Sequence, residues 1–149
     1  VWVDPREEEF GVVPSGVETR VTDRWEGLLN AAPAGSGVLV LTQSHTLDAL
    51  ITGAALERGD LRYVGMIGSR TKRKRFESAF RQIDIPQDRI DRLVCPIGDF
   101  GGRDKRAEVI ATFVTAEVAA RMLCRADSPQ VSESVISDTN NVTLPAILS

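Results

Sequence analysis

The chain of 149 residues is poor in cysteine, histidine and aromatic residues, and each shortage argues against a class of protein. Its two cysteines, Cys95 and Cys124, form neither a disulfide framework nor a paired metal-binding spacing, which favours a reducing, cytoplasmic location. His45 is the only histidine, so a histidine-based metal centre would lack further ligands. The apolar runs have the length of strands, and no membrane-spanning segment is predicted.

Positive charge is also limited overall, since the net charge is −3 and the basic residues gather in one local patch. Domains that bind nucleic acid are usually basic, with aromatic residues among the cations. The basic run here meets no aromatic residue before Phe76, so no nucleic-acid partner is expected. Hydrophobic residues make up 42% of the chain and charged residues 26%, which is typical of one globular domain.

Residues 62–76 (RYVGMIGSRTKRKRF) are the most informative segment. An apolar run meets a turn bracketed by Gly65 and Gly68, Ser69 follows as a helix cap, and five of the next six residues are cations. A glycine turn that leads into a helix start points backbone N–H groups and the positive end of the helix dipole at one place. The segment predicts an anion site, with phosphate as the favoured ligand and Arg70 and Lys72 as direct contacts. The alternative is a solvated helix face.

Strand-like apolar runs alternate with helical segments along the chain. The expected strands are residues 1–4, 38–42, 63–67 and 93–97. The expected helices are residues 46–58, 69–83, 86–92 and 105–123, with a further short helix around Trp25. The run at 38–42 is typical of a strand covered on both faces. In the helix at 46–58 a stripe that includes Leu50 is expected to be buried.

This alternation predicts an α/β fold with a doubly wound, mainly parallel sheet. Residues 1–124 are expected to form the domain, and residues 125–149, rich in Ser, Thr, Asn and Asp, a flexible tail. Loops at residues 43–48, 68–72 and 98–104 follow strand ends. Because ligands bind at the carboxyl ends of such strands, we expect all three loops to line one rim.

The segments LTQSHTLD, RYVGMIGSRTKRKRF and LVCPIG, with the helix start KRAEVIA, resemble the XdhC/CoxI-type accessory factors of xanthine dehydrogenase, and in particular their C-terminal Rossmann-like domain. The resemblance implies a chaperone without catalytic residues. Such proteins hold the molybdenum cofactor (molybdopterin), a pterin with a phosphate and a dithiolene-bound metal, while a cysteine desulfurase installs its terminal sulfur. They then deliver it to the xanthine dehydrogenase apoprotein, and a homodimer is expected. The positions that match the family's motifs, and so are candidate cofactor contacts, are His45, Asp48, Gly65, Gly68, Ser69, Arg70, Lys72, Pro96 and Gly98.

The chain departs from the family pattern in three ways. Gln43 stands where the family tends to have His, and Ala107 where it tends to have Pro. Family members also carry a strand and a glycine-rich turn before the segment that resembles residues 1–7. The sheet is therefore expected to lack its central strand and to leave unpaired edges at residues 1–4, 38–42 and 63–67, as a fragment of a longer protein would.

Asp4 and Cys95 each allow two interpretations, and two other functions compete with the accessory role for the chain as a whole. Asp4, at a strand end, suits a ribose hydroxyl or a solvated loop, and the loop is favoured. Cys95 suits a soft metal or sulfur contact or a small buried side chain, and burial is favoured. The chain as a whole also fits a nucleotide-dependent enzyme, either a dehydrogenase or a nucleotidyltransferase, on the same fold. A non-functional truncated copy is the third interpretation.

Overall fold

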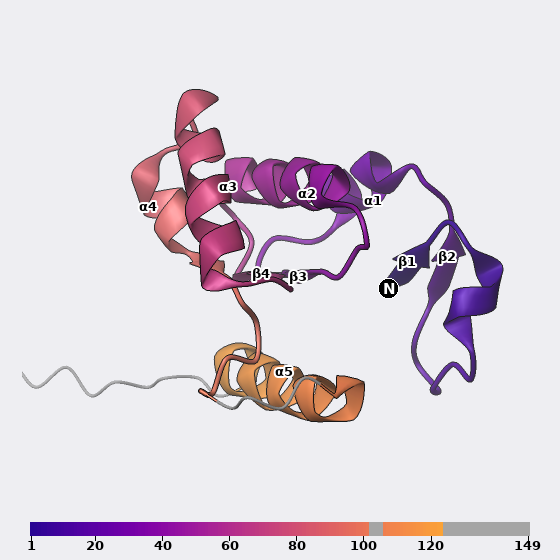
Figure 1. Cartoon of the computed structure of the whole chain (residues 1–149). Coiled ribbons are helices and arrows are strands. Elements are labelled where there is room, and N and C mark those ends of the chain that lie inside the picture. The colour runs from indigo at the N-terminus through magenta and orange to yellow at the C-terminus, as the bar shows by residue number, and fades with distance from the viewer. Residues whose placement is uncertain (102–105, 124–149) are drawn as a thin grey trace, which may run out of the picture.

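The computed structural model describes residues 1–101 and 106–123 (Figure 1). Its elements follow in this order: β1 (Trp2–Asp4), the 3-10 helix η1 (Glu7–Phe10), β2 (Thr19–Val21), α1 (Trp25–Ala31), β3 (Gly37–Val40), α2 (His45–Arg58), β4 (Tyr63–Met66), α3 (Arg70–Gln82), α4 (Gln87–Asp91), β5 (Leu93–Val94) and α5 (Ala107–Met122). Strands alternate with helices, which confirms the α/β class. The predicted tail at 125–149 and Cys124 lie outside the described residues.

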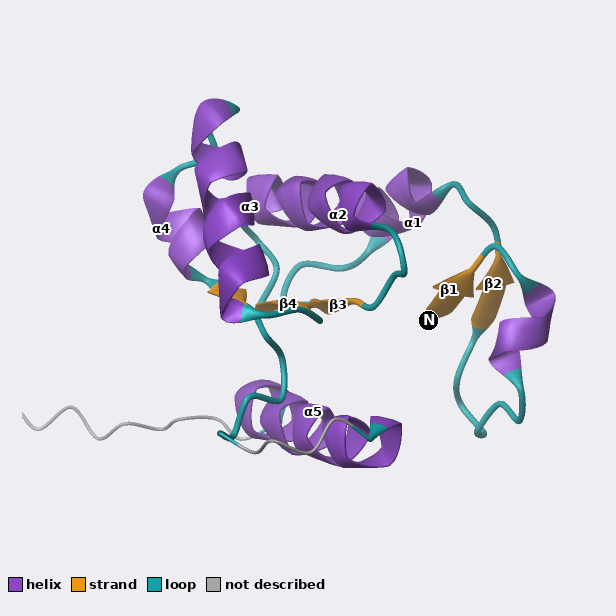
Figure 2. Ribbon diagram, viewed as in Figure 1, coloured by secondary structure: helices purple, strands orange, loops and turns teal. Residues whose placement is uncertain are grey.

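Every strand pair is parallel, and the strands form two sheets that are drawn apart in Figure 2. One sheet pairs β1 with β2, and the other has the order β3-β4-β5. The prediction that residues 63–67 form an unpaired edge is wrong, because β4 lies between β3 and β5. Within the described residues, β1 and β3 each keep one edge without a partner strand.

The hydrophobic core lies on the face of the β3-β4-β5 sheet that α2 and α3 cover, and α5 lies on the opposite face (Figure 1). All four residues of β4 are buried. Helix α5 covers its face less completely, since none of its 16 residues is fully buried. Leu39 lies on that face of β3 and is 38% exposed. The expectation that residues 38–42 are covered on both faces is therefore wrong.

Strand β1 is exposed too, and the burial expected for the stripe of α2 does not hold at Leu50. Trp2 of β1 is 40% exposed, because its strand pairs only with β2 and its ring packs edge-on against Phe10, with 5.1 Å between the ring centroids. In α2 the predicted core residue Leu50 is 58% exposed. The helix instead turns Asp48 and Thr52 inward, and the Thr52 hydroxyl lies 3.5 Å from the sulfur of Met66 in β4.

The helix ends follow the local sequence signals. The hydroxyl of Ser69 accepts a hydrogen bond from the Lys72 amide at 3.1 Å, which confirms Ser69 as the cap of α3. Ser44 caps α2 in the same way, and Gly59 ends that helix with a φ of 71°, a backbone conformation that favours glycine. In the ranges described, no helix combines the length and the apolar character needed to cross a membrane.

Candidate functional site

The loops that follow β3, β4 and β5 meet at one edge of the sheet, because the three strands are parallel. The ammonium of Lys72, after β4, contacts the carboxylate of Asp48, after β3, at 2.6 Å. A guanidinium nitrogen of Arg70 lies 3.2 Å from a carboxylate oxygen of Asp99, in the loop after β5. These contacts confirm the predicted rim for the described parts of the three loops.

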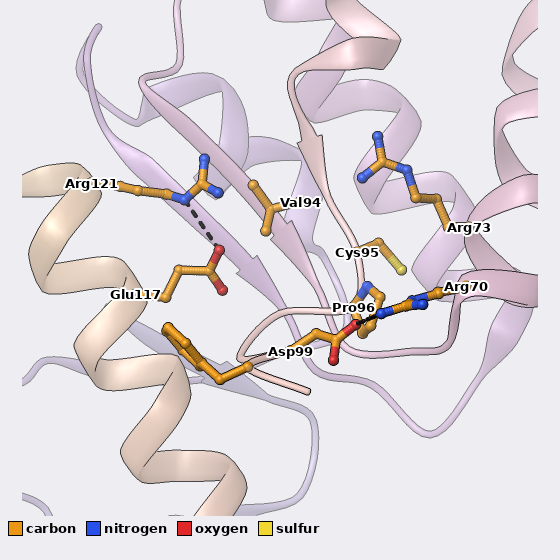
Figure 3. A pocket seen from close by; sticks show the side chains of 9 residues that line it. Arg70, Arg73, Val94, Cys95, Pro96, Asp99, Glu117 and Arg121 are labelled. Carbon is orange, nitrogen blue, oxygen red and sulfur yellow. Dashed lines mark hydrogen bonds and ion pairs between the residues drawn. The ribbon is translucent and has the colours of Figure 1, made fainter. Parts of the chain in front are cut away.

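A cavity of about 450 Å³ opens at this rim, between the start of α3, the end of β5 and α5 (Figure 3). From α3 it is lined by Arg70 and Arg73, and from the end of β5 by Val94, Cys95 and Pro96. Its other lining residues are Asp99 and Phe100 of the following loop, and Glu117 and Arg121 of α5. The volume lies in the range of sites for small molecules and cofactors.

Three guanidinium groups give the pocket its positive charge. Each is paired with a carboxylate: Arg70 with Asp99 at 3.2 Å, Arg73 with Glu77 at 2.6 Å, and Arg121 with Glu117 at 3.1 Å. The Arg70 side chain is 82% exposed, and ion pairs this open to water contribute little stability. Arg70 can therefore exchange Asp99 for an anionic ligand, and guanidinium groups suit phosphate oxygens in particular.

Cys95 and Pro96 form the wall of the pocket at the end of β5. Cys95 is only 4% exposed, and its sulfur lies 4.0 Å from the carbonyl oxygen of Ser69. Burial raises the pKa of this thiol, although the nearby Lys72 and Arg73 act to lower it. The expected burial of Cys95 is confirmed, and its sulfur is an uncharged thiol at neutral pH.

The α5 side of the pocket depends on a close approach at Gly98. The Gly98 amide donates a hydrogen bond of 2.7 Å to the carboxylate of Glu117. Gly98 has a φ of 68°, and a Cβ built there would lie 3.0 Å from the backbone nitrogen of Val114. Only glycine suits both conditions. Gly98 therefore serves to bring the loop after β5 against α5.

Lys72 and Asp48 form a buried ion pair outside the pocket lining. Their side chains are 13% and 1% exposed, respectively. Asp48 also accepts a hydrogen bond of 2.7 Å from the hydroxyl of Thr42, and Lys72 donates one of 3.1 Å to the carbonyl of Ile67. The structure thus directs the Lys72 charge inward to Asp48, and Arg73, from the same helix, takes the place in the pocket that the sequence assigned to Lys72.

The two glycines of the basic segment serve side-chain packing. Gly65 lies inside β4 and not in the turn, and a Cβ there would come within 2.5 Å of the Tyr63 ring. At Gly68 an added Cβ would lie 2.9 Å from the Lys72 side chain and 3.1 Å from the Cys95 sulfur. Both positions need glycine because neighbouring side chains occupy the space.

The structure brings together only part of the predicted set. Arg70 and Pro96 line the pocket, while Ser69 and Gly98 contact residues that line it. His45 is the exposed first residue of α2 and does not line it. Asp4 accepts hydrogen bonds from the side chain and backbone of Arg6, which lower its pKa and occupy its carboxylate locally. The favoured loop interpretation of Asp4 agrees with this contact.

Besides Cys95, six lining residues were not among the candidate contacts, although Asp99 and Phe100 belong to a loop that was expected at the rim: Arg73, Val94, Asp99, Phe100, Glu117 and Arg121. A signal existed for two of them, since Glu117 and Arg121 are four residues apart in α5 and thus share one helix face. Glu117 also lies beside the apolar residues Val114 and Val118 in the sequence, at a position typical of the side of a helix that faces a sheet. Among residues 1–101 and 106–123, no three acidic, histidine or cysteine side chains are grouped to hold a metal ion.

Comparison with known proteins agrees with the resemblance seen in the sequence. A search of curated proteins gave no match. The model of a family described as the XdhC Rossmann domain matches residues 1–118, which span both sheets and most of α5. The chain therefore belongs to the XdhC Rossmann domain family.

Proposed function

We propose that this domain binds the molybdenum cofactor, molybdopterin, and supports its sulfuration and its insertion into xanthine dehydrogenase, with no catalytic step of its own. Membership of the XdhC family supports an accessory role for that enzyme. The observation that carries the binding proposal is the convergence of Arg70, Arg73 and Arg121 around the end of β5. In this proposal a cysteine desulfurase and the xanthine dehydrogenase apoprotein are the partners, and the domain works as a homodimer.

The side chains in the pocket fit the chemistry of this cofactor. Its phosphate is an anion, for which the guanidinium groups of Arg70 and Arg73 are suitable donors. When bound, the cofactor brings its own metal, held by its dithiolene sulfurs, so the protein does not have to supply a complete set of ligands. Cys95 adds only a buried, uncharged thiol to the wall. We propose that the arginines hold the cofactor and that the walls shield it from water.

Titration with molybdopterin, released from a molybdoenzyme without oxygen, tests the proposal. Replacing both Arg70 and Arg73 with Ala should weaken binding by more than about tenfold, since charge-assisted hydrogen bonds contribute roughly 1.5–3 kcal/mol each. Arg75→Ala is the matched control, because Arg75 is exposed on the same helix and does not line the pocket. It should leave the affinity almost unchanged.

Two results would overturn the proposal. One is equal affinity of the wild type and the double variant for molybdopterin. The other is a clear preference for nucleoside triphosphates or nicotinamide dinucleotides over molybdopterin in competition, which would favour a nucleotide-dependent enzyme on the same fold.

A further inference from the structure

The pocket has two chemically different sides. On the α3 side stand Arg70 and Arg73, and on the α5 side stand Glu117 and Arg121, as Figure 3 shows. Val94, Cys95 and Pro96 lie between them, at the end of β5. The α3 side carries two guanidinium groups, with the Asp99 carboxylate beside Arg70, whereas the α5 side carries one guanidinium, that of Arg121, beside the Glu117 carboxylate. A ligand that spans the pocket would therefore meet different partners at its two ends.

Glu117 is held firmly and still has capacity to accept hydrogen bonds. One carboxylate oxygen accepts from the Gly98 amide at 2.7 Å, and the other from Arg121 at 3.1 Å. The side chain is 13% exposed, so most of it is fixed against the protein. A carboxylate has about four acceptor positions, and among the described residues these two bonds leave one position on each oxygen. Glu117 can thus accept from two adjacent N–H groups of a ligand.

Phe100 adds an aromatic surface on the same side. Its ring packs against Phe113 of α5, with the centroids 5.1 Å apart, and the residue is 60% exposed. Large aromatic side chains that line a pocket while open to solvent are suited to stack on a planar ring. Phe100 therefore complements Glu117, because an aromatic ring can stack on the face of a heterocycle while a carboxylate accepts from its edge.

We propose that the α5 side recognises the heterocycle of the ligand, with Glu117 accepting from two neighbouring N–H donors and Phe100 stacking on the ring, while Arg70 and Arg73 hold the phosphate. This inference rests on the proposed function and specifies the ligand further. The 2-amino-4-oxo edge of a pterin presents two adjacent donors, the amino group and the ring N–H. A pteridine with oxygen at position 2 presents an acceptor there and would be repelled by the carboxylate.

The experiment compares a pterin that carries a phosphorylated side chain with the lumazine that carries the same side chain and has oxygen at position 2. The wild type should bind the pterin about tenfold more tightly, because a bidentate pair of this kind distinguishes the two edges. Glu117→Gln should abolish or reverse this preference, because an amide can donate to the oxygen at position 2. Glu108→Gln, at an exposed position of the same helix, is the control and should keep the preference.

The arginine variants separate this inference from the proposed function. The Arg70 and Arg73 double variant should weaken both ligands with little change in their ratio, and Phe100→Leu should weaken both by several-fold. An unchanged ratio in Glu117→Gln, or no preference in the wild type, would overturn the assignment of Glu117. If binding still depends on the arginines in that case, the proposed function stands. If neither phosphorylated pteridine binds the wild type, both proposals fail.

Discussion

At the scale of single residues, Tyr63 is the least satisfied polar group. It is 3% exposed, and its hydroxyl is a buried side-chain atom without a hydrogen-bond partner in the part of the chain that the structure describes. The ring lies over Gly65, where a Cβ would come within 2.7 Å of the hydroxyl oxygen. Burial, followed by the charge of Glu117, raises the pKa of Tyr63 to about 12. A buried hydroxyl without a partner lowers the stability of the folded state, and a buried phenolate would lower it further.

The first prediction concerns the titration of this group. Tyr63 is the only tyrosine, so tyrosinate absorbance reports on it alone, and the midpoint in the folded protein should lie near 12 and not near 10. Because the unfolded chain ionises first, the contribution to the free energy of unfolding is complete below pH 10 and is lost as the pH rises towards 12. Tyr63→Phe should lack both effects and melt at the same or a higher temperature. A midpoint near 10 in a folded sample would contradict the prediction.

The neighbouring residues in the sequence predicted which residues begin and end helices. They did not predict which distant partners the long side chains contact. Ser69 was identified as a cap and residue 58 as the end of a helix, because each role follows from neighbouring residues. The partner of Lys72 could not be predicted, since Asp48 is 24 residues away and reaches it only through the pairing of β3 with β4. The contact of Glu117 with the Gly98 amide could not be predicted either, because Gly98 is 19 residues away in the loop after β5.

At the scale of elements, the buried pair of Asp48 and Lys72 joins the first turns of α2 and α3. Asp48 is the fourth residue of α2 and Lys72 the third of α3, and both helices start at the carboxyl edge of the sheet. The Lys72 ammonium also lies 5.6 Å from the centre of the Phe76 ring. The pair therefore fixes the spacing of the two helix starts, and with it the direction in which Arg70 and Arg73 leave α3.

The second prediction tests this pair by its effect on stability. Lys72→Met leaves a buried carboxylate without its partner and should lower the free energy of unfolding by about 3–5 kcal/mol. The double change Asp48→Asn with Lys72→Met removes both charges and keeps an oxygen for the Thr42 hydroxyl, so it should cost less than the single change. Chemical denaturation measures both values. A single variant as stable as the wild type would show that the pair does not hold the helices.

The hydrophobic pattern alone did not predict where β5 ends or which residues of α2 are buried. The apolar run at residues 93–97 predicted a full strand, but β5 contains two residues, because Cys95 and Pro96 already turn into the pocket wall. Leu50 fits a helical stripe, yet α2 presents Thr52 and Asp48 to the interior, where each has a polar partner. The hydrophobic pattern predicts the period of a helix, but it does not show which polar residues are buried because they have partners inside the protein.

At the scale of the whole molecule, β1 and β3 each keep an edge without a partner strand among the described residues. Both strands carry exposed apolar side chains beside these edges, with Val3 37% exposed and Leu39 38%. Leu41, directly after β3, is 57% exposed. Strand edges with free backbone groups and apolar neighbours readily pair with other chains. The described fold can therefore associate through these edges, in agreement with the proposed homodimer.

The last prediction is that the 149-residue chain associates through the edge of β3 as its concentration rises. Leu39→Lys should reduce association, because a charge on an edge strand opposes the addition of another strand. Val12→Lys is the matched control, since Val12 is 97% exposed and belongs to no strand, and it should leave association unchanged. Sedimentation velocity over a range of concentrations measures the effect. A wild-type chain that stays monomeric at all concentrations and unfolds in one cooperative transition would show that the β3 edge does not recruit a partner.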